Sequence, residues 1–110
     1  MVLSKMVTVS FESKVWELCR KIPKGKLTTY KEIGKALHTK AYRAVGQALK
    51  KNKNTHATPC HRVVNSNGSL GGYYGKLNSI RKINLLEKEG IKVEKGRIAN
   101  FKEKLFSYPC

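Results

Sequence analysis

Residues 29–51 read TYKEIGKALHTKAYRAVGQALKK and contain two short helical patterns separated by a polar break. Thr29 and Glu32 have the spacing of a capping box, which predicts a first helix that continues to about Leu37. A second helical pattern covers residues 41–51. Two short helices joined by a tight connection are typical of a helix-turn-helix, the commonest helical DNA-binding unit.

The second of these helices carries small residues beside basic ones. Ala41, Ala44 and Ala48 recur at helical spacing. Small side chains could serve helix–helix packing, or they could let the backbone of the helix approach a partner closely. Both interpretations stay open on spacing alone, and the strongly basic context favours contact with DNA.

The rest of the chain predicts an α+β fold that is mostly helical. Ser10 is a plausible cap for a helix that ends before Pro23, and residues 24–27 read as a basic connector. Further along, the sequence predicts a short strand at 63–64 and an irregular glycine-rich loop over 68–75. A helix capped by Asn78 and stopped by Gly90 is expected next, followed by a short strand at 91–93 and a basic tail. In the last helix, Ile80, Ile83 and Leu86 are expected to face inward.

The chain has 110 residues, of which 40% are hydrophobic and 27% charged, so one globular domain over 1–110 is expected. No room is expected for an additional N-terminal domain. Apolar runs are too short for a membrane span or a secretory signal. A cytoplasmic monomer with no membrane partner is therefore predicted.

Charge is the most informative part of the composition. There are 23 Lys and Arg against 7 acidic residues, a formal net charge of +16. This excess predicts a polyanionic partner, with nucleic acid favoured over a membrane surface. All seven acids are Glu, which argues against magnesium nucleases built on paired Asp, calcium loops and Asp-based triads. Ribosomal proteins have similar charge, so charge alone does not separate an enzyme from a structural RNA-binding protein.

Three cysteines are widely spaced, with no pairing typical of zinc or of a disulfide framework, so no metal is expected. Cys19 fits the apolar stripe of the first helix, and Cys110 is the last residue. Cys60 stands in the polar sequence Pro59-Cys60-His61-Arg62-Val63, between glycine-rich and polar loops. Most lone cysteines are inert, but this setting favours a reactive thiolate. His61 is adjacent and could act on the thiol through a bridging water.

This pentapeptide resembles the active-site signature of the O6-alkylguanine-DNA alkyltransferases, the methylated-DNA–protein-cysteine methyltransferases. The similarity extends over roughly residues 10–90. Matching positions are the Arg43-Ala44-Val45-Gly46 run seventeen residues before Cys60, Asn52, Tyr30, Gly72-Tyr73 and Glu87, twenty-seven residues after Cys60.

The resemblance implies a self-inactivating repair enzyme that needs no cofactor. It would flip an O6-alkylguanine out of duplex DNA and transfer the alkyl group to Cys60, acting once. By this resemblance Cys60 would be the nucleophile, His61 the base that acts through water, and Glu87 the residue that orients His61. Asn52 would brace the active-site turn, and Tyr30 would donate a proton to O6. Arg43 would be the finger that fills the gap left in the base stack. Expected DNA contacts are Thr29, Lys31, Ala41, Ala44, Gly46 and Gln47, and expected pocket residues are Val63, Tyr73, Tyr74 and Gly75.

Simpler roles remain open for three of these residues. Arg43 could contact phosphate, Glu87 could pair with neighbouring cations in solvent, and Tyr30 could be a core residue. For the whole protein, the alternative is a DNA-binding protein that recognises flipped or alkylated bases without catalysis. A ribosomal-type RNA-binding protein would leave the residue spacing as coincidence.

The chain departs from the family pattern at Thr58, Tyr74 and Lys76. The related alkyltransferase-like proteins carry tryptophan in place of the cysteine, so Cys60 favours transfer over binding alone.

Overall fold

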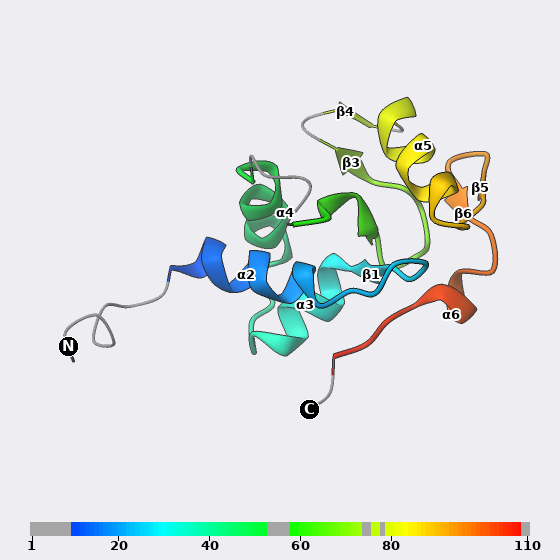
Figure 1. The fold of residues 1–110 in the computed structure, drawn as a ribbon. Coiled ribbons are helices and arrows are strands. Elements are labelled where there is room, and N and C mark those ends of the chain that lie inside the picture. The colour runs from blue at the N-terminus through cyan, green and yellow to red at the C-terminus, as the bar shows by residue number, and fades with distance from the viewer. Residues whose placement is uncertain (1–9, 53–57, 74–75, 78, 109–110) are drawn as a thin grey trace.

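The structure is a computed structural model, and it describes residues 10–108 apart from 53–57, 74–75 and 78 (Figure 1). Within these ranges no helix has both the length and the apolar character to cross a lipid bilayer. The elements in chain order are α2 (Phe11–Arg20), β1 (Thr28–Thr29), α3 (Tyr30–Ala36), α4 (Tyr42–Lys50), the 3₁₀ helix η1 (Cys60–Arg62), β2 (Val63–Val64), β3 (Gly72–Tyr73), β4 (Lys76–Leu77), α5 (Ile80–Lys88), β5 (Val93–Glu94), β6 (Arg97–Ile98) and α6 (Phe101–Lys104). The α+β, mostly helical prediction is confirmed.

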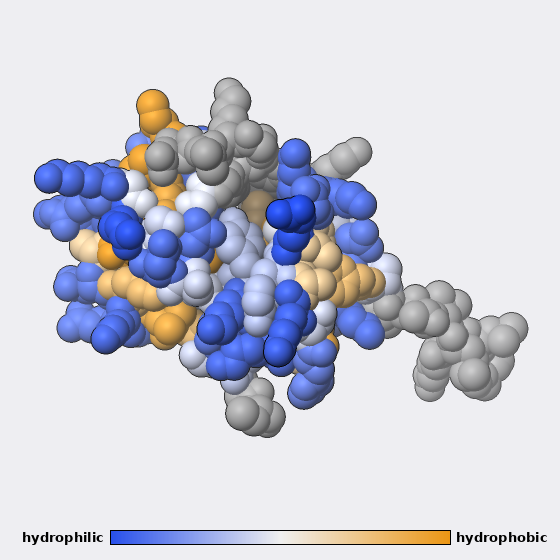
Figure 2. Space-filling model, turned by 180° about the vertical axis from the view of Figure 1, so that it is seen from behind, coloured by the Kyte–Doolittle hydropathy of each residue, from blue (hydrophilic) through white to orange (hydrophobic). Residues whose placement is uncertain are grey.

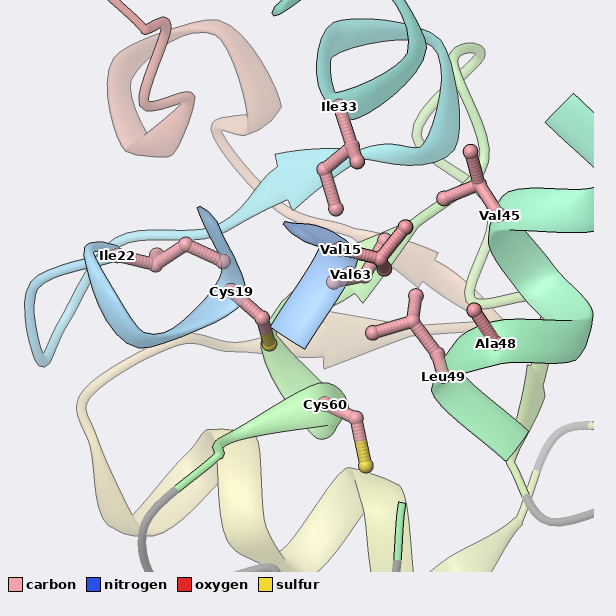
Figure 3. Close-up of a cluster of buried hydrophobic side chains, with 9 residues drawn as sticks. All are labelled: Val15, Cys19, Ile22, Ile33, Val45, Ala48, Leu49, Cys60 and Val63. Carbon is pink, nitrogen blue, oxygen red and sulfur yellow. The ribbon is translucent and has the colours of Figure 1, made fainter. Parts of the chain in front are cut away.

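The N-terminal half is a three-helix unit whose helix starts follow the predicted caps. The hydroxyl of Ser10 accepts a hydrogen bond from the Ser13 amide at 3.1 Å, and that of Thr29 accepts one from the Glu32 amide at 3.0 Å. Each bond satisfies an amide that the first turn of a helix leaves without a partner. The apolar faces of α2, α3 and α4 meet in one cluster, which includes Val15, Ile33, Val45 and Leu49 (Figure 3).

Helices α3 and α4 form the predicted helix-turn-helix, and a glycine sets how closely they approach. A Cβ on Gly34 would lie 2.6 Å from Cε1 of Tyr42, so no larger residue fits without movement of the tyrosine ring. The connection bends through His38, which has a φ of 58°. The amide of Thr39 donates back to the Gly34 carbonyl at 2.9 Å, which closes the turn.

A short parallel sheet joins this unit to the cysteine segment. In β1 and β2, Thr28 pairs with Val63 and Thr29 with Val64. The strand at 63–64 was predicted, whereas β1 was not, because two threonines between a basic connector and a helix cap give no alternating pattern. The pairing brings the start of α3 beside the end of η1.

Helix α5 corrects two sequence predictions about its ends and faces. Ser79 is its N-cap, with the hydroxyl 3.4 Å from the Lys82 amide, and the expected cap Asn78 lies outside the described residues. Ile80 is 74% exposed rather than buried, whereas Lys82 is fully buried. Ile83 packs against the second buried cluster, so the predicted inward face is right at Ile83 and wrong at Ile80. Leu86 is buried, as expected.

The predicted strand at 91–93 is found at Val93–Glu94, and the segment after it is folded, so the prediction of a basic tail is wrong. Strands β5 and β6 form a hairpin in which Val93 pairs with Ile98, and α6 follows directly. Leu105 then bridges to Leu27 in parallel, which extends the small sheet beyond β1. Apolar side chains here are spaced widely among lysines, so the sequence shows no helix or strand pattern in this segment. Those that pack against the two buried clusters are Val93, Ile98, Phe101, Phe106 and Tyr108.

Candidate active site

Cys60 is the first residue of η1 and lies at the edge of the N-terminal core. Its exposed fraction is 7%, against 0% for Cys19 in the same cluster. Figure 3 shows Cys60 on the opposite side of this cluster from Ile33, with its sulfur directed away from that residue. Burial raises the pKa of the Cys19 thiol, and a charge on Cys60 would raise it further. Cys19 is therefore a core residue, as predicted, whereas Cys60 lies at the edge of the core.

Asn52 contacts both the turn that leads to Cys60 and Cys60 itself. Its Nδ2 atom donates to the Thr58 carbonyl at 3.0 Å and lies 3.8 Å from Sγ of Cys60. Thr58, a departure from the family pattern, is buried, and its hydroxyl accepts a hydrogen bond from Nε of Arg20 at 3.0 Å. An apolar residue at position 58 could not accept this hydrogen bond from Arg20.

Glu89, and not Glu87, is the carboxylate that contacts His61. The Nε2 atom of His61 lies 3.1 Å from Oε2 of Glu89. Glu87, at the same C-terminal end of α5, is exposed and lines a shallow hollow together with Gly90. The prediction of Glu87 is wrong because it counted residues across a loop, and loop length is not fixed by helix geometry. The position immediately before the helix-stopping Gly90 is the signal that could have found Glu89.

The imidazole of His61 is oriented by this contact. An ionised carboxylate only accepts hydrogen bonds, so Nε2 carries the hydrogen and Nδ1 is the acceptor of the neutral ring. Nδ1 is buried and has no hydrogen-bond partner among the described residues. Burial lowers the pKa of His61, although the bond to Glu89 works to raise it. His61 therefore has the protonation state and the unused acceptor that a base needs.

Lys82 is a buried cation near Cys60 that sequence reasoning missed. Its Nζ donates to the carbonyls of Val63 at 2.7 Å and of Leu70 at 2.6 Å. Burial lowers the pKa of Lys82 to about 7, and a charge on Cys60 would raise it. The signal was present, because Lys82 lies four residues before the buried Leu86 and so on the same helix face. The carbonyl of Val63, an expected pocket residue, thus accepts one hydrogen bond from Lys82 and has a second lone pair.

Four of the seven predicted DNA-binding residues, together with the predicted proton donor Tyr30, line one open hollow of about 820 Å³ between α3, α4 and the segment after β2. Its lining contains Tyr30, Lys31, Arg43, Gly46 and Gln47 from the predicted set, and also Tyr42, Asn65, Ser66 and Asn67. The three residues after β2 were not predicted, because no motif marks them. Cys60 is not in this lining.

Tyr30 connects the hollow to the buried cysteine. Its ring packs against the cluster that contains Cys60, and its Cε1 would lie 3.9 Å from a Cβ on Gly46 of α4. Its hydroxyl would lie 3.3 Å from a Cβ on Gly71, which has a φ of +73°. Burial and the proximity of Cys60 raise the pKa of Tyr30 to about 12, so the phenol keeps its proton at neutral pH.

The small-residue stripe of α4 divides between the two interpretations. Ala48 is buried in the core, where it packs helix on helix. Ala41, the residue before the helix, and Ala44 are exposed together with Arg43. Thr29 is buried with its hydroxyl in the cap of α3, so its side chain is not available for the DNA contact that was expected.

The remaining predicted pocket residues are described only in part. Gly72 and Tyr73 form β3, and Tyr73 pairs with Lys76 of β4. Tyr74 and Gly75 lie outside the described residues. Figure 2 shows hydrophilic side chains over much of the face opposite the view of Figure 1, as expected for a chain with a net charge of +16.

Comparison with protein families and curated proteins gives a consistent picture. A family model described as "6-O-methylguanine DNA methyltransferase, DNA binding domain" matches residues 10–91. A methylated-DNA–protein-cysteine methyltransferase of Candida glabrata is 44% identical over 87 residues, which are 78% of this chain and 41% of that protein. A bifunctional methyltransferase/endonuclease of Picrophilus torridus is 40% identical over 94 residues, 84% of this chain and 31% of that protein. The chain thus spans less than half the length of these curated relatives.

Solved structures with the same fold include two bound to DNA. Schizosaccharomyces pombe Atl1 in complex with damaged DNA containing O6-carboxymethylguanine has a TM-score of 0.78 at 31% identity, covering 89% of this chain and 95% of that one. Mycobacterium tuberculosis OGT in complex with DNA has a TM-score of 0.67 at 39% identity, covering 76% of this chain and 51% of that one.

Proposed function

Because the chain belongs to the 6-O-methylguanine DNA methyltransferase family, we propose that it repairs duplex DNA by moving an alkyl group from O6 of guanine to Sγ of Cys60. The observation that carries this proposal is the setting of Cys60 on η1. Asn52 reaches its sulfur on one side, and the next residue, His61, is held by a carboxylate with its Nδ1 unused by any described residue.

The reaction is a displacement at an sp³ carbon, for which a soft thiolate is well suited. The S–C bond forms as the C–O6 bond breaks. His61 accepts the thiol proton at Nδ1 through a water molecule, and O6 of the departing guanine takes a proton from the Tyr30 hydroxyl. The thioether has no easy hydrolytic exit, so each protein molecule acts once and no cofactor is needed.

DNA is bound through α4 and the hollow beside it. The helix enters the minor groove, where the exposed Ala41 and Ala44 allow the backbone to approach closely, and Lys31 and Gln47 contact the strands. Arg43 is exposed on the same helix and fills the place in the stack from which the alkylated guanine is flipped. Tyr30, which lines the hollow and packs toward Cys60, marks the path of the flipped base.

Binding without transfer is the second candidate. One observation favours it: the Atl1 complex with O6-carboxymethylguanine DNA has the higher TM-score of the two DNA complexes compared, and this chain covers 95% of it. Cys60 favours transfer, since the alkyltransferase-like pattern has no cysteine at this position.

Intact-protein mass after incubation with methylated duplex DNA tests the proposal. One added methyl group on Cys60, with a plateau at one equivalent however much DNA is supplied, is expected for the wild type. Cys60→Ala should bind the same DNA without a mass change, because the basic surface remains. Cys19→Ala should still accept the methyl group and is the matched control. A wild type that binds methylated DNA but never gains mass would leave binding alone as the function.

A further inference from the structure

Arg62 binds the same carboxylate as His61. Its Nε lies 2.8 Å from Oε1 of Glu89 and its Nη2 lies 2.6 Å from Oε2, while Nη1 donates to the Ile22 carbonyl at 2.9 Å. The side chains of Arg62 and Glu89 are only 15% and 11% exposed. A two-pronged contact between guanidinium and carboxylate is short, charge-assisted and fixed in direction. Arg62 therefore sets where the Glu89 carboxylate stands.

Glu89 needs such a partner because its position is unfavourable for a negative charge. It is the C-cap of α5, where the partial negative charge of the helix end repels an anion. Burial works to raise the pKa of Glu89, but the hydrogen bonds from Arg62 and His61 outweigh it and keep the pKa below its usual value. The carboxylate is thus ionised in the folded protein.

We propose that Arg62 is a positioning residue of the transfer reaction: by holding Glu89 and placing a positive charge beside it, Arg62 keeps the imidazole of His61 neutral, with Nδ1 ready to accept a proton. This inference rests on the proposed function of Cys60 and His61. It assigns to the arginine of the Pro-Cys-His-Arg sequence a role in protonation rather than in DNA contact.

The charges that face His61 explain why a neutral ring needs this help. A carboxylate beside a histidine alone favours the imidazolium form. Here burial lowers the pKa of His61, Glu89 works to raise it, and the positive charges of Arg62 and Lys82 lower it again. Helix α2, which also packs on η1, carries Cys19, which interacts with Cys60 and Arg62, and Arg20, whose Nε donates to the Thr58 hydroxyl.

Loss of the Arg62 charge would have two effects, and both would favour the protonated form of His61. Repulsion of the imidazolium would disappear, and Glu89 would be left to interact with His61 alone. His61 would then hold a proton on both nitrogens near neutral pH and could not accept one from the thiol. Transfer would need a higher pH, at which His61 becomes neutral again.

The histidine itself provides the readout, by ¹H–¹⁵N NMR of the imidazole during a pH titration without DNA. In the wild type, His61 is expected to be neutral at pH 7 with its hydrogen on Nε2, and its signal is assigned with His61→Gln. Arg62→Met and Arg62→Gln should raise the His61 pKa by about 1 unit or more. Arg62→Lys keeps the charge and should shift it much less. Arg20→Met removes a neighbouring arginine that does not touch Glu89 and should leave it unchanged.

Each outcome bears on the proposal. A wild-type His61 that is protonated at pH 7 would overturn it without any variant, even if both neutral variants failed to fold. An equal rise in Arg62→Lys or Arg20→Met would mean disturbed packing rather than lost charge. Because no substrate is present, failure of alkyl transfer leaves this readout intact. Where transfer occurs, the acid limb of the pH–rate profile of Arg62→Met and Arg62→Gln should move to higher pH by the same amount as the His61 pKa.

Discussion

The carboxamide nitrogen of Asn52 and the sulfur of Cys60, eight residues apart in sequence, lie 3.8 Å from each other, and the same nitrogen donates to the Thr58 carbonyl at 3.0 Å. One side chain therefore supports the turn before the cysteine and presents a hydrogen-bond donor to its sulfur.

Asn52→Ala should destabilise the protein and slow transfer. The Thr58 carbonyl would lose the donor that Asn52 supplies in the interior, at a cost of about 1–3 kcal/mol in the free energy of unfolding. Thermal unfolding should show a drop in Tm of roughly 4–8 °C for each kcal/mol in a domain of this size. Asn84→Ala, on the exposed face of α5, is the control and should change neither quantity.

Glu89→Gln should slow alkyl transfer, and Glu87→Gln should not. Of these two glutamates, Glu89 is the one that contacts His61, so its loss weakens support for the imidazolium that forms when the thiol proton leaves. Positioned bases contribute about 10²–10⁴-fold in rate, which is the upper range of the expected defect. Single-turnover rates should converge above the thiol reference pKa of about 8.5, where ionisation needs no base. A defect in Glu87→Gln alone would restore the spacing-based assignment.

Arg43→Ala should slow repair of duplex DNA strongly while reaction with the isolated alkylguanine base changes little. Flipping a base costs a few kcal/mol, and each 1.36 kcal/mol left uncompensated is about tenfold in rate. Single-turnover rates on both substrates measure the difference. Arg81→Ala removes an exposed cation on α5 and is the matched control. Equal slowing on the two substrates would mean that Arg43 serves the fold or the thiolate.

DNA affinity should fall steeply with salt. If the net charge of +16 engages phosphates, log K should decrease with log salt with a slope of about −0.9 for each phosphate neutralised. Sequence preference should be weak, because the minor groove presents a degenerate pattern. Titrations at several salt concentrations, with duplex RNA as comparison, measure both. Insensitivity to salt, or preference for RNA, would contradict the proposed partner.

The free energy of unfolding should rise with pH from the acid range to about 9 and fall above about 10.5, where the unfolded Lys82 no longer binds more protons than the folded one. The folded pKa values of Glu89, His61 and Lys82 are all lowered, so the unfolded chain binds more protons and stability grows as pH rises through their ranges. Burial raises the folded pKa values of Cys19 and Tyr108, so the stability they contribute is lost at alkaline pH. Urea unfolding at several pH values tests this, and Lys82→Met should flatten the rise above pH 7.

Local sequence was enough to predict the helix-turn-helix and to propose Cys60 as the reactive cysteine. Ser10 and Thr29 cap helices through bonds to amides three residues away, and Gly34 permits the close crossing of α3 and α4, so these features depend on short-range chemistry. The segment around Cys60 is also local, since its neighbours in sequence are its neighbours on η1.

Tertiary structure alone decided which distant groups meet at that cysteine. Glu89 rather than Glu87 contacts His61. The segments that join η1 to α5 set how α5 is rotated relative to His61, and the length of such segments follows no periodicity. Lys82 is buried for the same reason, because the rotation that exposes Ile80 turns this lysine toward the Val63 carbonyl. A helix presents every side chain at a fixed angle to the next, but only packing against the rest of the chain determines which of those angles faces the site.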